Sequence, residues 1–215
     1  MLSVGRLVVI EGLDGAGKRT LSDALEKALV ARGAGVARFA FPRYEEDVHA
    51  ELVRDALHGR LGDLVESVHG MAVLYALDRR SAAPHVRTAL ATTDVVLVDR
   101  YIASSAAYCA ARLHQDAGGE FVAWLRELEI DRFGIPVPDH QLLLAVPRSV
   151  AAERAAHRER TESGRQRDAY ESDAELQERT AAVYAQLAAA SWLSPWTVLD
   201  GAAAVDATAL TEQFG

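Results

Sequence analysis

The sequence predicts an α/β fold, in which five parallel β-strands are covered by helices on both faces. Short apolar segments rich in β-branched residues alternate with longer segments whose apolar residues recur with the period of a helix. One short segment, VVLVD at residues 95–99, is apolar up to its last residue, which is typical of a central parallel strand buried on both faces. Strands and helices that alternate in this way form a parallel sheet between two helical layers.

The apolar pattern places each element along the chain. Strands are expected at residues 7–11, 36–41, 95–99, 141–146 and 196–199. Helices are expected at residues 18–32, 46–58, 63–90, 104–113, 119–133, 149–158 and 173–190, with a final helix at the C-terminus. The first helix should end at Gly33, a residue favoured at that position. Pro84 should kink or break the helix at 63–90.

Length and composition favour one globular domain spanning residues 1–215. Its formal net charge of −8 argues against binding to nucleic acid or to anionic membranes, so phosphates would have to be held by local cationic clusters. The only cysteine, Cys109, allows no internal disulfide, and no run of 18 apolar residues occurs, so a cytoplasmic protein is expected. The seven histidines show no metal-ligand spacing.

The residues after the first strand match a phosphate-binding loop, G-x-x-x-x-G-K, from Gly12 to Lys18. Its glycines let successive N–H groups point at a phosphate, and the following helix adds its positive N-terminal end. The alternative is a tight turn with an incidental lysine, which the strand–loop–helix context disfavours. Residue 19 is arginine, where such loops normally carry a Ser or Thr that holds magnesium. We therefore expect magnesium to be coordinated by oxygens other than a loop hydroxyl.

The second strand is followed by Phe41, Pro42, Arg43 and Tyr44. An aromatic ring and an arginine at a strand end could stack on a base and hold an anion. The Phe41–Pro42 bond could be cis, although most such bonds are trans. The alternative is a strand terminator with a packed phenylalanine.

The third strand ends in Asp99-Arg100. A carboxylate at the tip of an apolar strand can help to hold magnesium, and the arginine can fork onto a phosphate. The alternative is a salt-bridged strand end. Ser104, Ser105 and Tyr108 would face the same site from the first turns of the next helix.

The segment after the fourth strand carries six arginines between residues 148 and 167. It could form a lid, at approximately 154–170, that closes over a triphosphate and neutralises the charge of the transition state. A solvated helix face with nearby glutamates as partners is an equally good interpretation.

Together the motifs EGLDGAGKRT, FPRY, LDR, VDRY followed by SSAAY, and DAYE resemble those of the thymidylate kinase family, in its order and spacing across nearly the whole chain. The similarity is strongest to mycobacterial-type bacterial members. The resemblance implies a P-loop NTPase-type three-layer fold with an Arg-rich lid, and transfer of the γ-phosphoryl of ATP to dTMP with Mg²⁺ as cofactor. It also implies a homodimer.

The resemblance further implies which residues would bind the base and sugar of dTMP. Phe41 would stack on thymine, and Arg79 would hydrogen-bond to its O4 edge. Ser104 and Ser105 would lie at the polar edge of the base. Tyr108 would sit under the sugar at C2′ and disfavour a ribose hydroxyl.

For the acceptor phosphate, the resemblance implies a ring of Arg43, Tyr44 and Arg100. Tyr170, within the DAYE motif, would also bind the substrate, and Asp14 would reach the sugar 3′-OH.

The phosphates of ATP would be held by Gly12, Gly15, Ala16, Gly17, Lys18, Arg19 and Thr20. The metal would be held by Asp14, Asp99 and Glu171. The residues implied to act in catalysis are Lys18, Arg19, Arg100, Asp99, Asp14 and one arginine of the lid. The sequence does not fix which of Arg154, Arg158, Arg160, Arg165 and Arg167 this is, and Arg158 is the first choice. Arg19 could bridge the β- and γ-phosphates.

Two other functions use the same loop. A kinase for another small acceptor, such as a deoxynucleoside or a different monophosphate, would differ at residues 41–44, 79 and 104–108. A regulatory switch that hydrolyses nucleotide slowly would have no acceptor, and a base pocket argues against it.

Overall fold

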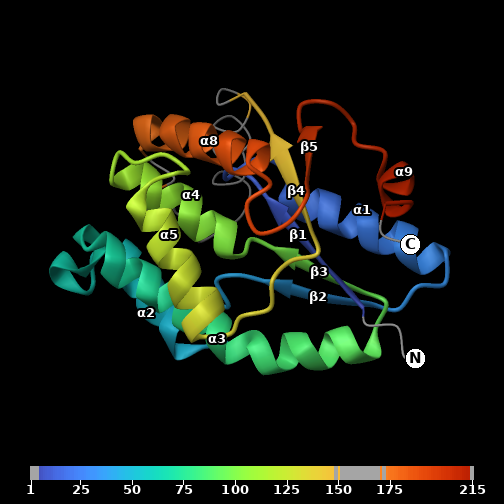
Figure 1. Cartoon of the computed structure of the whole chain (residues 1–215), viewed down its shortest axis with the longest axis horizontal. Coiled ribbons are helices and arrows are strands. Elements are labelled where there is room, and N and C mark those ends of the chain that lie inside the picture. Colours follow the sequence, from blue (N-terminus) through green and yellow to red (C-terminus); the bar gives the residue numbers. More distant parts are fainter. Residues whose placement is uncertain (1–4, 148–149, 151–169, 171–172, 214–215) are drawn as a thin grey trace.

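The computed structural model describes residues 5–147, 150, 170 and 173–213. Its centre is a five-stranded sheet in the order β2-β3-β1-β4-β5, with every strand parallel to its neighbours (Figure 1). The strands are β1 (Arg6–Glu11), β2 (Val36–Ala40), β3 (Val95–Asp99), β4 (His140–Ala145) and β5 (Trp196–Asp200). The predicted parallel sheet of five strands is confirmed.

Helices cover both faces of this sheet. The described helices are α1 (Lys18–Ala31), α2 (Val48–Leu57), η1 (Gly62–Glu66), α3 (Val68–Thr92), α4 (Ile102–Arg112), α5 (Glu120–Arg126), η2 (Glu127–Arg132), α8 (Ala174–Ala189) and α9 (Ala207–Thr211). One apolar cluster joins Val8 and Ile10 of β1 to α1 and α9. The other joins Val9 to α2, α3, α4, α5 and α8. Alternate residues of β1 therefore face two helical layers, as a three-layer fold requires.

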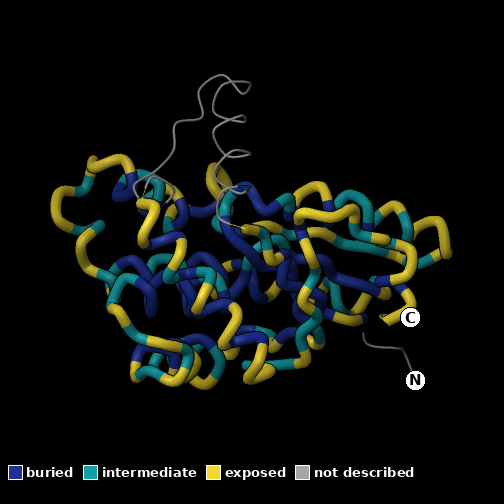
Figure 2. Tube along the Cα trace, turned by 90° about the horizontal axis from the view of Figure 1, so that it is seen from above, coloured by how far each residue is buried: buried dark blue, intermediate teal, exposed yellow. Residues whose placement is uncertain are grey.

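Figure 2 shows buried residues in the interior of the molecule and exposed residues along its outline. The strand register brings the chemically active ends together at one edge. Ile10 pairs with Asp99 of β3, and Glu11 pairs with Leu143 of β4. The loop after β1 and the turn after β3 therefore leave the sheet side by side, at the carboxyl edge where parallel sheets bind ligands.

The predicted bounds of two helices are wrong, because local caps were overlooked. Helix α2 begins at Val48 and not at residue 46, since the Asp47 carboxylate accepts a hydrogen bond from the backbone N–H of His49 at 2.9 Å. Helix α3 begins at Val68, where the hydroxyl of Ser67 caps it by accepting from the N–H of Gly70 at 3.1 Å. The residues from 62 to 66 form a separate 3₁₀ helix, η1.

The prediction that Pro84 interrupts a helix is also wrong in one respect, because α3 continues through it to Thr92. Proline removes the hydrogen bond to the carbonyl of the residue four positions earlier, here Arg80. Both residues are exposed, so water can replace the missing bond.

The remaining helix predictions differ in smaller ways. Helix α4 begins at Ile102, two residues before the predicted start. The segment expected as one helix over 119–133 is α5 followed by the π-helix η2, whose wider turn buries Glu129. Apart from residues 150 and 170, the helix expected at 149–158 and the lid expected at 154–170 lie outside the described residues.

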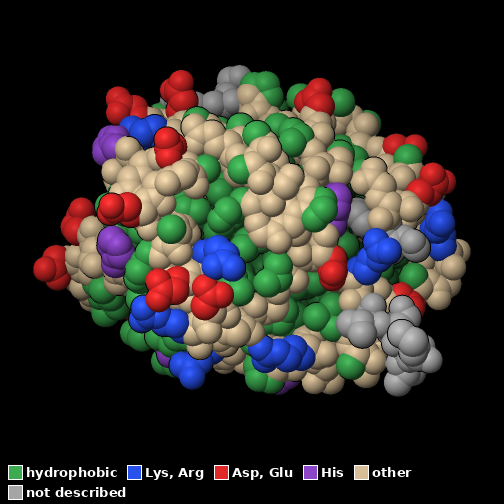
Figure 3. Space-filling view, in the orientation of Figure 1, with side chains coloured by type: hydrophobic (Ala, Val, Ile, Leu, Met, Phe, Trp, Pro, Cys, Tyr) green, Lys and Arg blue, Asp and Glu red, His purple; other side chains and the backbone are tan. Residues whose placement is uncertain are grey.

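On the face seen in Figure 1, acidic and basic side chains are interspersed over the surface (Figure 3). Within the part of the chain that the structure describes, no helix is long and apolar enough to cross a membrane.

Candidate active site

The loop after β1 has the backbone geometry of a phosphate cradle. Gly12 has φ 144°, and a Cβ there would lie 2.8 Å from the carbonyl oxygen of Leu144. Gly17 precedes α1 in the left-handed conformation, with φ 101°. Larger side chains would be strained at both positions, so these two glycines are required for the loop to follow this path. The backbone N–H groups at the start of α1 thus face the carboxyl edge of the sheet, where they can bind a phosphate.

Lys18 is buried beneath this loop. Its ammonium donates to the carbonyl oxygens of Gly12, at 3.2 Å, and Leu13, at 3.0 Å. Burial is the main cause that lowers the pKa of Lys18, to about 8, and the positive charge of Arg100 lowers it further. Nearby carboxylates, Asp14 first among them, oppose this shift. Lys18 is therefore a desolvated cation whose charge is sensitive to what binds beside it.

Asp14, Arg100 and Tyr108 form a second cluster at the same edge. The guanidinium of Arg100 pairs with Oδ1 of Asp14, and the hydroxyl of Tyr108 donates to Oδ2 at 3.0 Å. Burial alone would raise the pKa of Asp14, but the charges of Arg100 and Lys18 outweigh it, so this pKa lies below its usual range. Arg100 also stacks on Tyr108, with its Cζ 5.5 Å from the ring centre. The structure thus brings three sequence-predicted site residues into direct contact.

The backbone of Arg100 is held in an unfavourable conformation. Its φ is +62°, in the left-handed region that large side chains avoid, at a cost on the order of 1–3 kcal/mol. The amide N–H of Arg100 donates to the carbonyl of Ile10 at 3.0 Å, which ties the turn after β3 to β1. Strain of this kind concentrates at functional sites.

The base pocket predicted from the sequence begins with Phe41, which is buried and is joined to Pro42 by a cis peptide bond. Its ring centre lies 5.7 Å from that of Tyr101. Arg43, at 5.9 Å over the Phe41 ring, is held by the Asp78 carboxylate at 2.8 Å and by Asp47 at 3.0 Å. Its charge is therefore already compensated within the protein.

Tyr44 is 37% exposed, with Arg54 over its ring at 5.9 Å. Tyr170 is buried and stacks on Tyr108, with ring centres 6.5 Å apart and an interplanar angle of 21°. Arg112 lies 4.8 Å over the Tyr170 ring and donates to its hydroxyl. Tyr108 and Tyr170, 62 positions apart in sequence, thus form one aromatic wall next to Asp14.

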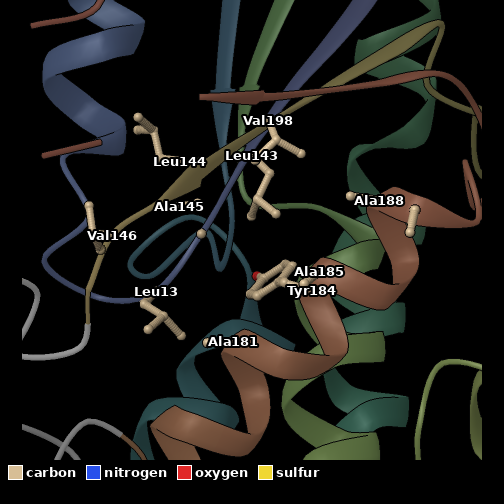
Figure 4. A pocket seen from close by; sticks show the side chains of 12 residues that line it. Leu13, Leu143, Leu144, Ala145, Val146, Ala181, Tyr184, Ala185, Ala188 and Val198 are labelled. Carbon is tan, nitrogen blue, oxygen red and sulfur yellow. The ribbon is translucent and has the colours of Figure 1, made fainter. Parts of the chain in front are cut away.

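An apolar cavity of about 280 Å³ lies between the phosphate loop, β4 and α8 (Figure 4). Leu13, Leu143 and Tyr184 are among the side chains that line it. Because its lining is mainly apolar, it suits a hydrophobic group better than a phosphate. Gly12, a predicted contact of the ATP phosphates, also lines this cavity.

Residues 10–205 match the family model for thymidylate kinase. The thymidylate kinase of Mycobacterium tuberculosis (strain H37Rv) is 52% identical over 193 residues, which cover 90% of each chain. The chain belongs to the thymidylate kinase family. Its similarity extends to the thymidylate kinases of Leifsonia xyli subsp. xyli, at 37% identity over 86% of this chain and 82% of the relative, and of Homo sapiens, at 29% over 94% and 85%.

Membership of the thymidylate kinase family confirms the resemblance and makes the protein an enzyme of the nucleoside monophosphate kinase class. It also agrees with the observed P-loop NTPase-type fold.

The described carboxylates fit magnesium only in part. Oδ1 of Asp99 is buried and has no hydrogen-bond partner among the described residues, so it can accept a cation or a water bound to one. Both oxygens of Asp14 are already taken by Arg100 and Tyr108. Glu171 lies outside the described residues. Within the described ranges, no three or more His, Cys, Asp and Glu residues are grouped so that they could hold a metal. A magnesium ion bound by one or two carboxylates, with phosphates and water completing its shell, fits this arrangement.

The other residues predicted to contact ATP differ in how far they are buried. Gly15 and Ala16 are buried within the loop, whereas Arg19 and Thr20 are exposed at the start of α1. Arg158 lies outside the described residues.

The sequence analysis missed Glu11, the last residue of β1, which is fully buried. Its Oε1 accepts from the backbone N–H groups of Tyr101, at 2.9 Å, and Ser104, at 3.2 Å. Its Oε2 accepts from the hydroxyls of Ser104, at 2.6 Å, and Tyr184, at 2.9 Å. Burial raises the pKa of Glu11, and these donors oppose the rise. Glu11, on β1, therefore caps the N-terminal end of α4 and fixes the turn that carries Arg100. In the sequence, the only signal for this role is an acidic residue directly before the phosphate loop.

The low pKa of Lys18 predicts a pH dependence. We expect kcat/KM for ATP to fall as pH rises above about 8, because the free enzyme then loses the charge that attracts phosphate. Bound phosphates favour the charged form, so kcat at saturating ATP should stay level to higher pH. A kcat/KM that is constant from pH 7 to about 9.5 would contradict the assignment.

The same shift has a defined effect on the stability of the free enzyme. The pKa of Lys18 is about 8 in the folded protein and 10.5 ordinarily, so the unfolded chain binds more protons between these values. The contribution of Lys18 to the free energy of unfolding should therefore increase with pH in this window.

Proposed function

We propose that this protein is a thymidylate kinase that transfers the γ-phosphoryl of ATP to the 5′-phosphate of dTMP, giving dTDP and ADP. The observation that carries the proposal is the pairing of two clusters at one sheet edge. A phosphate loop with buried Lys18 lies beside the Asp14–Arg100–Tyr108 cluster. The first suits the donor phosphates, and the second suits the phosphate and sugar of an acceptor.

The proposed mechanism needs no general base, because the attacking oxygen of the acceptor phosphate is already an anion at neutral pH. Catalysis comes from in-line positioning and from neutralising charge as the phosphoryl group moves. Lys18 draws the donor phosphates into the loop, and Arg100 holds the acceptor phosphate. Asp99, Asp14 and Glu171 would hold Mg²⁺, which when bound would supply positive charge to offset that of the donor phosphates.

Several residue roles belong to this proposal. Phe41 stacks on the base, Tyr108 lies under the sugar at C2′, and Tyr170 supports Tyr108 from behind. Arg19, exposed at the start of α1, can reach the β- and γ-phosphates, and Thr20 keeps a hydroxyl nearby. Arg158 of the lid would add positive charge during transfer.

Because Arg43 is already paired with Asp78 and Asp47, we propose that it mainly shapes the turn after β2. Tyr44 would then contact the acceptor phosphate together with Arg100.

The experiment that tests the function measures ADP release from ATP and Mg²⁺ with dTMP, dUMP, UMP, dCMP, dAMP, thymidine or no acceptor. We expect dTMP to be preferred, dUMP to be weaker, and UMP to remain near background because Tyr108 crowds C2′. Preference for another acceptor would be consistent with the proposed role of the phosphate loop but would contradict the proposed thymine pocket. Slow hydrolysis that is independent of any acceptor would favour a regulatory switch.

We also propose that residues 1–215 act as one kinase domain, in the cytoplasm, as a homodimer. The absence of a membrane-spanning helix among the described residues is compatible with this location, and family membership supports the assembly. Sedimentation that shows only a 23.2 kDa species at micromolar concentration would contradict the dimer.

A further inference from the structure

Arg79, on α3, is held by a partner that the sequence motifs did not indicate. Its Nε donates to Oε2 of Glu129, and its Nη2 donates to Oε1, both at 2.6 Å. The two side chains are 2% and 0% exposed, so this bidentate ion pair is excluded from water. Glu129 lies 50 positions later in the chain, on the π-helix η2, and the two elements meet only in the folded protein.

The remaining contacts of Arg79 define which of its donors is left for a ligand. Nη2 also donates to the hydroxyl of Ser105 at 2.7 Å, so both of its hydrogens are used. Among the described residues, Nη1 has only a long contact, to the carbonyl oxygen of Tyr101 at 3.4 Å. A guanidinium has five N–H donors and no acceptor. The geometry therefore commits Nε and Nη2 to the protein and leaves donor capacity at Nη1.

This free donor lies beside the proposed base pocket. Nη1 contacts the backbone of Tyr101, whose ring is the neighbour of Phe41. A donor fixed next to a stacking ring can donate to a carbonyl oxygen, such as the one at position 4 of thymine or uracil. It rejects the amino group that cytosine carries there, because two donors would then meet. The orientation of Arg79 is thus what separates these bases.

From these contacts we propose that Glu129 is a positioning residue for the acceptor base: it fixes the guanidinium of Arg79 so that Nη1 donates to a carbonyl at position 4 of a pyrimidine. The inference rests on the proposed function. Glu129 also cancels the charge of Arg79, so a neutral base can enter without facing an unpaired buried cation. Buried ion pairs contribute little net stability compared with apolar residues of the same size, so holding the core together does not by itself account for this pair.

The local backbone supports such a role. The wide turn of η2 directs Glu129 into the core, while Glu127 and Arg132 of the same turn pair on the surface at 2.6 Å. The carbonyl of Glu129 accepts from the N–H of Ile135 at 2.9 Å, which anchors the turn. The π-helix thus provides a rigid support for one carboxylate.

The test compares Glu129→Gln with Glu127→Gln, a matched control in the same turn whose partner is exposed. In Glu129→Gln the amide presents a donor to Arg79, so the guanidinium must turn. We expect the KM for dTMP to rise about 10- to 100-fold and the preference for dTMP over dCMP, as a ratio of kcat/KM, to fall by a similar factor. The KM for ATP should not change, and Glu127→Gln should behave as wild type.

Calorimetric titration with dTMP and thermal unfolding separate this role from a structural one. Lower thermal stability with unchanged dTMP affinity and base preference would overturn the proposal. If Glu129→Gln does not fold, Glu129→Asp keeps the charge but shortens the side chain, and we expect a smaller rise in the KM for dTMP; no rise would again overturn it. If wild-type enzyme does not phosphorylate dTMP, the proposed function fails, and this inference fails with it. If the wild type phosphorylates dTMP and Glu129→Gln keeps the same KM for dTMP and the same base preference, only the inference about Glu129 is wrong.

Discussion

Replacing Lys18 with alanine should lower kcat by about 10³-fold, because the transferred phosphoryl group loses a cation placed in a desolvated site. Lys18 is buried under the loop, with its charge directed at the loop carbonyls until a phosphate competes for it. Steady-state kinetics with saturating ATP and dTMP measures the effect. The change is expected in kcat more than in the KM for dTMP, since the proposed acceptor contacts lie in the other cluster.

The chain offers a close control for this experiment. Lys27, the only other lysine, is exposed on the same helix, and Lys27→Ala should keep wild-type kinetics. Lys18→Met retains most of the side-chain volume and separates lost charge from lost packing. A folded Lys18→Met enzyme with kcat within about threefold of wild type would contradict the role of the charge.

Replacing Arg100 with alanine should reduce kcat/KM for dTMP by about 10²- to 10⁴-fold. Two effects combine: the acceptor phosphate loses a bidentate partner, and Asp14 is left as an uncompensated carboxylate next to that phosphate. In wild type, the pKa of Asp14 is held low mainly by Arg100, which opposes the effect of burial. The kinetics of the variant therefore report on both the missing cation and the exposed anion.

A double-mutant cycle with Asp14→Asn separates these effects. Because the two side chains are in contact, the effects of the two substitutions on kcat/KM should not be independent. The double variant should lose less kcat/KM than the product of the two single-variant factors. Arg100→Lys should recover only part of the activity, since an ammonium cannot reproduce the fork of a guanidinium. Strictly additive effects would mean that Asp14 and Arg100 act independently, which would contradict the observed ion pair.

The sequence predicted those features of the fold that depend on local pattern. Apolar runs such as VVLVD identified the strands, and the glycine spacing of Gly12 to Lys18 identified the loop, because both signals lie within about ten residues. Helix ends were less well predicted, since a capping side chain such as Asp47 or Ser67 decides them. Pro84 is accommodated because it lies on an exposed side of α3.

The proximity of several predicted site residues could be expected from the sequence, but their supporting contacts could not. Asp14, Arg100 and Tyr108 follow strands that end at the same edge, so their proximity could be expected from the topology. The pairs Arg43–Asp78 and Arg79–Glu129 join residues 35 and 50 positions apart, and only tertiary packing brings them together. Nothing local distinguishes Glu129 from the exposed Glu127 of the same π-helix.

Identification of the product tests the proposed reaction most directly. The enzyme would be incubated with ATP labelled at the γ-phosphate, Mg²⁺ and dTMP, and the nucleotides then separated. The account predicts that the label appears in dTDP, in amounts equal to the ADP formed, and that Lys18→Met abolishes this transfer. Label released as inorganic phosphate without dTDP, or carried by another acceptor in preference to dTMP, would contradict it.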